Sequence, residues 1–288
     1  GLSLAFSVAD EAMLVNKTRL ERLWGLNAQI MTGQQTRSRV PDLSNGVRAA
    51  AFSAEEGSAN PRLVTLAYAR KARQAGAAFL IHHRVVGLHH QRGWLLNLES
   101  HEGGKAGRPS IRARAILNAA GAWMGLVGQM SHVHLPMFPI ALQMNVTERA
   151  PARLPYLLQH VSQPLSLKQT VSGNYLIGGG WPARFALSDG RIDLSVKPAP
   201  RMPNIAGNLA VAVGVMPSLS RLALLRAWSG IVGVTTDQLP LLGKLDCLPD
   251  YYVAGGGSGF TLGPVYATLI AALIAEGGTD YDIDLYDP

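Results

Sequence analysis

Four of the five residues Gly255–Gly259 are glycine, near the end of a 288-residue chain. The apolar run Tyr251–Ala254 before them predicts a strand, and the small and apolar residues of Leu262–Glu276 after them predict a helix. A turn without Cβ atoms lets backbone N–H groups approach an anion or a flat ring, and the start of a helix adds about half a positive charge. The segment therefore predicts a ligand-binding turn or, equally well, a plain tight connection between strand and helix.

Strand and helix signals alternate near both ends of the chain. Leu2–Ser7 alternates apolar and polar residues, which predicts a strand, and Asp10–Trp24 has helical spacing with Asp10 as the expected N-cap. A second helix is expected over Arg62–Ala75, after an Asn-Pro pair. Helical spacing returns within Leu194–Val215, and the polar stretch His101–Ser110 predicts a hairpin loop.

Between these ends the pattern is mostly that of antiparallel strands joined by turns. Strands are expected at Val47–Ser53, Ala78–Ile81, Arg84–His90, Trp94–Glu99, Ile111–Leu117, Pro136–Val146, Ser162–Val171, Asn174–Gly178 and Leu222–Ile231. The whole pattern predicts an α/β fold in which a sheet domain is interrupted by a second, mostly antiparallel domain.

Composition narrows the function classes. With 48% hydrophobic and 16% charged residues, the chain is expected to bury a substantial core. The net charge of +7 is spread along the sequence without a dense basic run, which argues against a nucleic-acid partner. A single cysteine, Cys247, excludes an internal disulfide framework and fits a reducing, cytoplasmic location. We expect no signal peptide and no transmembrane segment, because no apolar run reaches 18 residues.

Two further patterns look functional and are rejected. Gly178–Ala183 matches G-x-G-x-x-A after a strand, but Pro182 and the polar residues after it do not supply the helix that a dinucleotide fingerprint needs. Paired histidines occur at His82-His83 and His89-His90, yet no nearby carboxylate or cysteine pattern accompanies them. No metal site is expected.

Four segments, taken in order, resemble the D-amino-acid oxidase superfamily of FAD-dependent oxidoreductases. Ala115–Trp123 (AILNAAGAW) resembles its "vvNAAGaW" strand and turn, and Gly257–Pro264 (GSGFTLGP) resembles its "GhGftlaP" flavin turn. Trp228–Gly230, followed by TDQLP and a glycine, resembles its "W-x-G…TpDglPiiG" segment. Glu56–Pro61 resembles its "dGhvnP" segment before a helix. The resemblance covers essentially the whole chain from Leu2 onward and includes glycine oxidase, sarcosine oxidase and dimethylglycine dehydrogenase.

The resemblance implies a sheet domain of the FAD/NAD(P)-binding type, incomplete at its N-terminus, interleaved with an antiparallel-sheet substrate domain. The substrate domain is expected over 1–55 and 131–225, and the FAD-binding domain over 56–130 and 226–288. The implied cofactor is FAD. By this resemblance, the backbone of Val85 matches a position that meets the adenine of FAD. The residues that match flavin-contacting positions of the family are Ala119, Ala120, Gly121, Trp123, Gly257, Ser258, Gly259, Phe260 and Thr261.

The family begins with a strand and a G-x-G-x-x-G turn that holds the FAD pyrophosphate, and nothing before or after Leu2 corresponds to it. We therefore expect a further N-terminal segment or a partner subunit to complete the FAD site. By this resemblance, the arginine that binds the substrate carboxylate in the family corresponds to a position near Val232, and the family's second basic residue corresponds to Ser258. Neither residue is charged here, so another cation must bind a substrate carboxylate. On the strand that resembles the pocket lining, Lys168 or Gln169 is expected to face the substrate.

The leading hypothesis is hydride transfer to FAD from the carbon beside an amine, giving an imine that hydrolyses. The expected substrate is an amino acid, or an N-substituted amino acid or imino acid such as sarcosine, proline or an opine. The alternative is a truncated, non-catalytic subunit or domain with a structural role. A third hypothesis is an FAD-dependent enzyme of the same superfamily that oxidises a 2-hydroxy acid.

Overall fold

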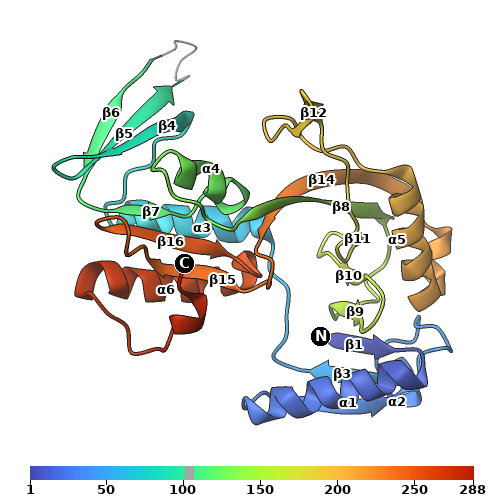
Figure 1. The fold of residues 1–288 in the computed structure, drawn as a ribbon. Coiled ribbons are helices and arrows are strands. Elements are labelled where there is room, and N and C mark those ends of the chain that lie inside the picture. The colour runs from blue at the N-terminus through green and yellow to red at the C-terminus, as the bar shows by residue number, and fades with distance from the viewer. Residues whose placement is uncertain (101–106) are drawn as a thin grey trace. The chain divides into compact units, whose positions relative to one another are not determined.

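The computed structural model describes residues 1–100 and 107–288 and divides the chain into two compact units. Unit 1 comprises Gly1–Ala59 and Ala141–Gly230, and unit 2 comprises Asn60–Ile140 and Ile231–Pro288 (Figure 1). Each unit is thus formed by two separate stretches of the chain. Helices and sheets occur in both, which confirms the predicted α/β fold class.

Unit 1 is built on an eight-stranded sheet with the order β14-β8-β11-β10-β9-β1-β3-β2. The sheet is mixed, because β1 pairs antiparallel with β3 and parallel with β9. Its strands are β1 (Leu2–Ala5), β2 (Ala28–Thr32), β3 (Ala49–Ser53), β8 (Phe138–Arg149), β9 (Leu158–His160), β10 (Ser166–Gln169), β11 (Asn174–Gly178) and β14 (Leu224–Val234).

The other elements of unit 1 are three helices, a 3-10 helix and a small hairpin. They are α1 (Val8–Leu23), α2 (Gly33–Arg39), α5 (Met202–Val215), η3 (Pro217–Arg221), β12 (Leu187–Ser188) and β13 (Arg191–Ile192). The prediction that Asp10 is the N-cap of α1 is wrong by three residues. Ser7 caps α1, and the Asp10 carboxylate accepts hydrogen bonds from the backbone N–H of Phe6 and Ser7 in a capping box.

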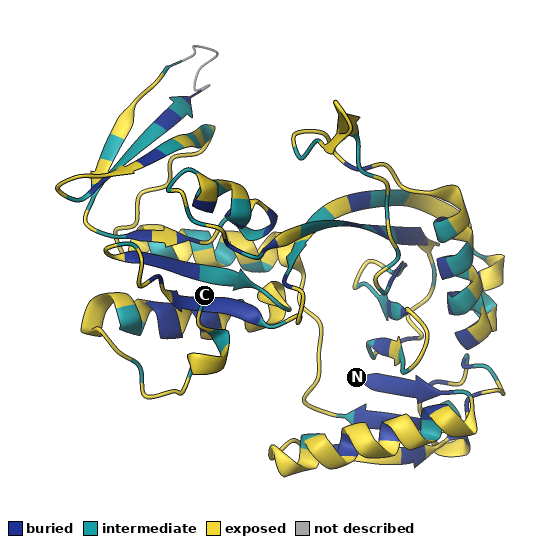
Figure 2. Ribbon diagram, in the orientation of Figure 1, coloured by how far each residue is buried: buried dark blue, intermediate teal, exposed yellow. Residues whose placement is uncertain are grey.

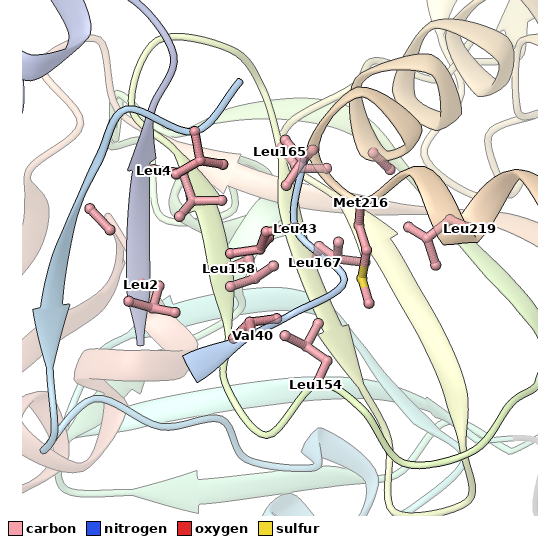
Figure 3. Close-up of a cluster of buried hydrophobic side chains, with 14 of the residues drawn as sticks. Leu2, Leu4, Val40, Leu43, Leu154, Leu158, Leu165, Leu167, Met216 and Leu219 are labelled. Carbon is pink, nitrogen blue, oxygen red and sulfur yellow. The ribbon is translucent and has the colours of Figure 1, made fainter. Parts of the chain in front are cut away.

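The main core of unit 1 lies on one face of this sheet, toward α5. Leu4, Leu158 and Leu167 are completely buried there, and Met216 follows α5 into the same cluster (Figure 3). Burying one leucine side chain contributes about 1.5–3 kcal/mol. Along β1 every residue is buried, whereas α1 exposes its outer side (Figure 2).

Unit 2 contains two three-stranded sheets with the orders β15-β16-β7 and β4-β5-β6. Their strands are β4 (His83–His90), β5 (Trp94–Ser100), β6 (Ser110–Ala113), β7 (Ile116–Asn118), β15 (Pro240–Lys244) and β16 (Tyr251–Gly256). The helices are α3 (Pro61–Gln74), η2 (Gly121–Trp123), α4 (Met124–Gln129), α6 (Gly259–Glu276) and η4 (Asp284–Tyr286).

One helix in the described ranges, α6, is long and apolar enough to cross a membrane by length and composition alone. Core helices pass the same test. Tyr266, Leu269 and Ile270 of α6 pack against Leu242 of β15 and Tyr252 of β16, and they are the only buried residues of this helix.

Several sequence predictions differ from the structure. Ala78–Ile81 is not a strand: its large side chains are exposed, and Phe79 instead stacks under the guanidinium of Arg73 at 4.7 Å. The single strand expected over Ile111–Leu117 is split into β6 and β7, which belong to different sheets. The loop expected over His101–Ser110 lies largely outside the described residues, since these omit 101–106.

Candidate functional site

Two turns that the sequence singles out leave the same edge of one sheet in unit 2. Strands β7 and β16 are parallel neighbours, with Ile116 opposite Tyr251 and Asn118 opposite Val253. Because the carboxyl ends of parallel strands meet at one edge, the turn after β7 and the glycine turn after β16 both start there. In open α/β sheets this edge is where ligands bind.

The turn after β7 is held by Asn118, which is 3% exposed. Its Nδ2 donates to the carbonyl of Met124 at 3.0 Å and to the Tyr251 hydroxyl at 3.1 Å, while its Oδ1 accepts from Ala120 N–H at 3.3 Å. Gly121 follows with a φ of +56° and open space where a Cβ would lie. The side chain of Asn118 therefore shapes a turn whose outer side is free.

Trp123 closes this turn, in the short helix η2. Its side chain is 41% exposed, whereas its neighbours Ala122 and Met124 are buried. Core packing does not account for this tryptophan. Ala119 is exposed, and Ala120 and Gly121 are half-buried, so every residue from Ala119 to Trp123 except Ala122 reaches the surface of unit 2.

The turn after β16 requires glycine at two positions. Gly256 has a φ of +90°, and a Cβ on Gly257 would lie 2.3 Å from the carbonyl oxygen of Gln238. Ser258 also adopts a left-handed conformation, with a φ of +52°. These three residues reverse the chain so that α6 begins immediately, at Gly259.

The N-terminus of α6 has no side-chain cap. Its first turn leaves the N–H groups of Gly259, Phe260 and Thr261 without an intrahelical acceptor, as in any α-helix. All three residues are exposed, and a Cβ on Gly259 would meet nothing within 4 Å. Open donors at the positive end of an 18-residue helix fit an electron-rich carbonyl or an anion such as the polar edge of a reduced flavin ring.

Two side chains that sequence reasoning missed support this turn. The Tyr266 hydroxyl donates to the Gly257 carbonyl at 2.5 Å, and burial raises the pKa of this tyrosine. Before β15, the Asp237 carboxylate accepts from Leu239 N–H at 3.0 Å, and this hydrogen bond is the main reason why the pKa of Asp237 is lowered. An isolated tyrosine beyond a glycine motif gives no sequence signal that would have found it.

Val85 lies in β4, the edge strand of the second sheet of unit 2. Its side chain is half-buried against the core that contains Trp94 and Tyr251. The outer backbone edge of β4 has no neighbouring strand in the described part of the chain, so the position is open to a ligand.

In unit 1, strand β10 separates the two substrate candidates onto opposite faces of the sheet. Leu167 is completely buried in the core, so its neighbour Lys168 points to the other face, opposite Leu176 of β11. The Lys168 ammonium donates to the Ala59 carbonyl at 3.4 Å and forms no ion pair within residues 1–100 and 107–288. Its charge is therefore available to a ligand.

The Gln169 amide, in contrast, is engaged with the backbone. Its Oε1 accepts from the N–H groups of Arg153 and Leu154, and its Nε2 donates to the carbonyls of Ala150, Pro151 and Gly173. These contacts hold the loop after β8 to the β10–β11 turn. Of the two sequence candidates, the structure leaves only Lys168 free to meet a substrate.

Two aromatic residues near β10, Tyr175 and Trp181, serve the packing of unit 1. Tyr175 is 2% exposed and belongs to the core of unit 1. Trp181 donates from Nε1 to the Pro164 carbonyl at 2.7 Å and packs against Gly207 of α5, where a Cβ would lie 2.6 Å from its ring.

Among the described residues, no group of three or more His, Cys, Asp or Glu side chains could hold a metal ion.

The family described as "DAO: FAD dependent oxidoreductase" matches residues 1–273, nearly the whole chain. The chain belongs to the DAO family of FAD-dependent oxidoreductases. This confirms the resemblance carried by the Asn118 turn and the glycine turn. The position that holds arginine in glycine oxidase falls at Val232, which is 43% exposed, and the second falls at the exposed Ser258.

Curated DAO-family relatives are similar at low identity. The HcnC subunit of the hydrogen cyanide synthase of Pseudomonas protegens is 27% identical over 86% of this chain and 56% of its own length. An opine oxidase subunit of Rhizobium meliloti is 26% identical over 89% of this chain and 63% of its own. The beta subunit of the sarcosine oxidase of Arthrobacter sp. is 25% identical over 90% of this chain and 62% of its own length. The chain thus spans 56% to 63% of these three relatives.

Solved structures have the same fold. L-proline dehydrogenase from P. horikoshii superposes with a TM-score of 0.86 at 25% identity, covering 100% of this chain and 75% of that one. Glycine oxidase from Geobacillus kaustophilus superposes with a TM-score of 0.83 at 22% identity, covering 99% and 73%. The DAO fold is therefore established for this chain.

Proposed function

We propose that this chain is the larger part of an FAD-dependent oxidoreductase that acts on the C–N bond of an amino acid or an N-substituted amino acid. The observation that carries the proposal is the shared edge of β7 and β16, where the two family turns leave side by side. The named substrates of its relatives, which include opines, sarcosine and proline, support an amine as the substrate.

The residues present in unit 2 fit a flavin. We assign the flavin ring to the stretch from Ala119 to Trp123 and to Gly257, Ser258, Gly259, Phe260 and Thr261, and the adenine portion to the backbone at Val85. FAD, when bound, supplies the acceptor of the hydride. The contribution of the chain is the uncapped start of α6, whose N–H donors stabilise negative charge beside them without having to reorganise.

Lys168 is proposed to bind the carboxylate of the substrate. A buried carboxylate without a partner is costly, so a cation or several donors must face it. The Lys168 ammonium lies on the face of β10 opposite the core and forms no ion pair among the described residues, whereas Val232 and Ser258 offer no charge.

The proposed FAD site is completed by a dinucleotide-binding segment, carried by the same polypeptide or by a partner subunit. Within the described residues, β7 pairs only with β16, so its second edge is open, and Leu117 on it is 41% exposed. Helix α3 buries none of its residues, and Leu63 and Leu66 are 66% and 68% exposed. An open strand edge and a helix with uncovered leucine side chains, in one unit, favour a further strand and helix. Three relatives are also named as subunits.

The test is product analysis with the protein as its gene encodes it, together with any subunit that co-purifies. Incubation with sarcosine, proline and an opine, followed by trapping of the carbonyl product with a hydrazine reagent, should reveal amine oxidation with at least one of them. A carbonyl product from 2-hydroxy acids alone would replace the proposed C–N chemistry with alcohol oxidation.

A second candidate function is a non-catalytic subunit with a structural role. It is favoured by the names of three relatives, each of which is described as a subunit of a larger enzyme. The two functions separate on flavin content: a catalytic protein purifies with FAD that its substrate reduces, whereas a protein with only a structural role contains no reducible flavin.

A further inference from the structure

Unit 1 contains a cavity that the proposed reaction does not use. It has a volume of about 660 Å³ and is lined by residues of the β12–β13 hairpin and of the start of α5. Its size is within the range of about 300–1,000 Å³ that is typical of small-molecule sites. Lys168 and Gln169 are not part of its lining.

Two arginines, Arg184 and Arg201, line this cavity, and no acidic residue among the described ones does. Both are exposed, and neither guanidinium forms an ion pair in the part of the chain that the structure describes. Helix α5 begins directly after Arg201 and has no side-chain cap, so its positive end faces the same region. The charge of the cavity therefore favours an anion.

A buried amide next to the cavity wall has a spare donor. Gln143 is 1% exposed, and its Oε1 accepts from the backbone N–H of Arg201 at 2.9 Å. Its Nε2 has no hydrogen-bond partner among the described residues. Gln143 does not line the cavity itself, but its hydrogen bond fixes the backbone of Arg201 at the start of α5.

The rest of the lining is apolar. Leu187, Ile192 and Met202 are 66%, 47% and 73% exposed, and Phe185 is half-buried beside them. Exposed apolar side chains grouped around two free guanidinium groups would be covered by a ligand that has an apolar body as well as a charge. An inorganic anion would leave them in water.

We propose that this cavity binds a small carboxylate that carries an apolar group, such as a medium-chain fatty acid. The planar guanidinium groups of Arg184 and Arg201 match a carboxylate by paired hydrogen bonds, and the apolar group covers Leu187, Ile192 and Met202. The ligand bridges the hairpin and α5.

Binding should also order the hairpin. β12 and β13 have two residues each and form a separate two-stranded sheet. An isolated hairpin of this size is marginally stable, and the paired backbone bonds between Arg184 and Ala199 are what tie it to its own base. A ligand held by Arg184 and Ile192 on one side and Met202 on the other adds a link from the hairpin to α5.

Titration calorimetry with octanoate tests the proposal. Octanol, which lacks the carboxylate, and inorganic phosphate, which lacks the apolar chain, are the controls. Octanoate should bind with 1:1 stoichiometry, and neither octanol nor phosphate should reach one tenth of its affinity. Arg184→Gln and Arg201→Gln should each weaken octanoate binding by about tenfold or more, which corresponds to ~1.4 kcal/mol. Both side chains are exposed, so the variants should keep the fold, as circular dichroism can verify.

Two matched variants locate the site. Arg191→Gln removes an arginine of the same hairpin that does not line the cavity, and Lys168→Met removes the cation proposed for the substrate; both should bind octanoate like the parent protein. Absence of octanoate binding, equal affinity for octanol, or an equal loss with Arg191→Gln would overturn the proposal. Loss with Lys168→Met alone would assign octanoate to the proposed substrate strand and overturn it as well.

Discussion

The side-chain amide of Asn118 donates a hydrogen bond to the hydroxyl of Tyr251 at 3.1 Å and thereby joins the end of β7 to the start of β16. Both groups are buried, and the Tyr251 ring also packs edge-on against Trp94, with centroids 5.3 Å apart. This buried polar contact thus anchors the turn after β7 to the strand that leads into the glycine turn.

Asn118→Ala should destabilise the protein and weaken flavin binding. The variant leaves the Met124 carbonyl and the Ala120 N–H without their partner, which costs about 1–3 kcal/mol. Tyr251→Phe removes only one hydroxyl and should cost about 1 kcal/mol. Urea denaturation of both variants and of the double variant measures the coupling. Additive effects would show that this contact does not link the strands.

Gly259→Ala should leave the fold intact and lower FAD affinity by about tenfold or more. A Cβ at this position meets nothing within 4 Å, and alanine favours a helix over glycine by about 1 kcal/mol, so lost affinity would come from space taken from the ligand. Gly263→Ala is the matched control, because it lies one turn further along α6 and is equally unobstructed. Equal FAD affinity of the two variants would remove α6 from the flavin site.

The variant Gly257→Val does not test whether the glycine turn contacts the flavin, although the glycine-rich sequence suggests it as a test. Its Cβ would collide with the Gln238 carbonyl of the protein itself, so loss of flavin in this variant reports on the turn and not on ligand contact. The sequence indicated that glycine is needed here but not for which neighbour.

Lys168→Met should raise KM for an amino-acid substrate by about tenfold or more, equivalent to ~1.4 kcal/mol of binding, with much less effect on kcat. The reason is that the ammonium would contact a carboxylate that does not change during the reaction. The corresponding substrate amide, which lacks the carboxylate, is the control and should be processed equally by parent and variant. An unchanged KM for the acid would exclude Lys168 as its partner.

Stability should fall as the pH drops below about 6.5, the ordinary pKa of histidine. Burial lowers the pKa of His160, and only Asp10 acts in the opposite direction. The Nδ1 of His160 accepts N–H groups from Ser162 and Gln163, so a proton there would displace both. The unfolded chain therefore binds this proton at a higher pH than the folded one, and unfolding free energy is lost between about pH 6.5 and the lower folded pKa.

Thermal denaturation at pH 7.5 and pH 5.5 checks this expectation. His160→Gln should reduce the difference between the two melting temperatures, whereas His134→Gln, at an exposed position, should not. An undiminished difference in His160→Gln would assign the pH dependence to other groups.

Periodic elements and family turns were predictable from the sequence. The spacing of apolar residues, together with glycine and proline at the ends of elements, predicts the strands around Leu2 and Tyr251 and the helices α1, α3 and α6. Nothing in the sequence showed that the end of β7 and the end of β16 are neighbours, because that pairing joins residues more than 130 positions apart.

Side-chain roles were less predictable than elements. Lys168 and Gln169 are adjacent and equally polar, and only the register that buries Leu167 shows that they point to opposite faces. The same limit applies to Asn118 and Tyr266, whose partners are fixed by tertiary packing.

The most direct test of the account is an anaerobic visible spectrum of the protein as its gene encodes it, loaded with FAD and titrated with secondary amino acids. The account predicts that at least one of sarcosine, proline or an opine bleaches the flavin absorbance. It also predicts that Gly259→Ala needs about tenfold more FAD or higher to reach the same bound flavin absorbance as Gly263→Ala. Flavin that stays oxidised with every amine, or that only 2-hydroxy acids bleach, would contradict it.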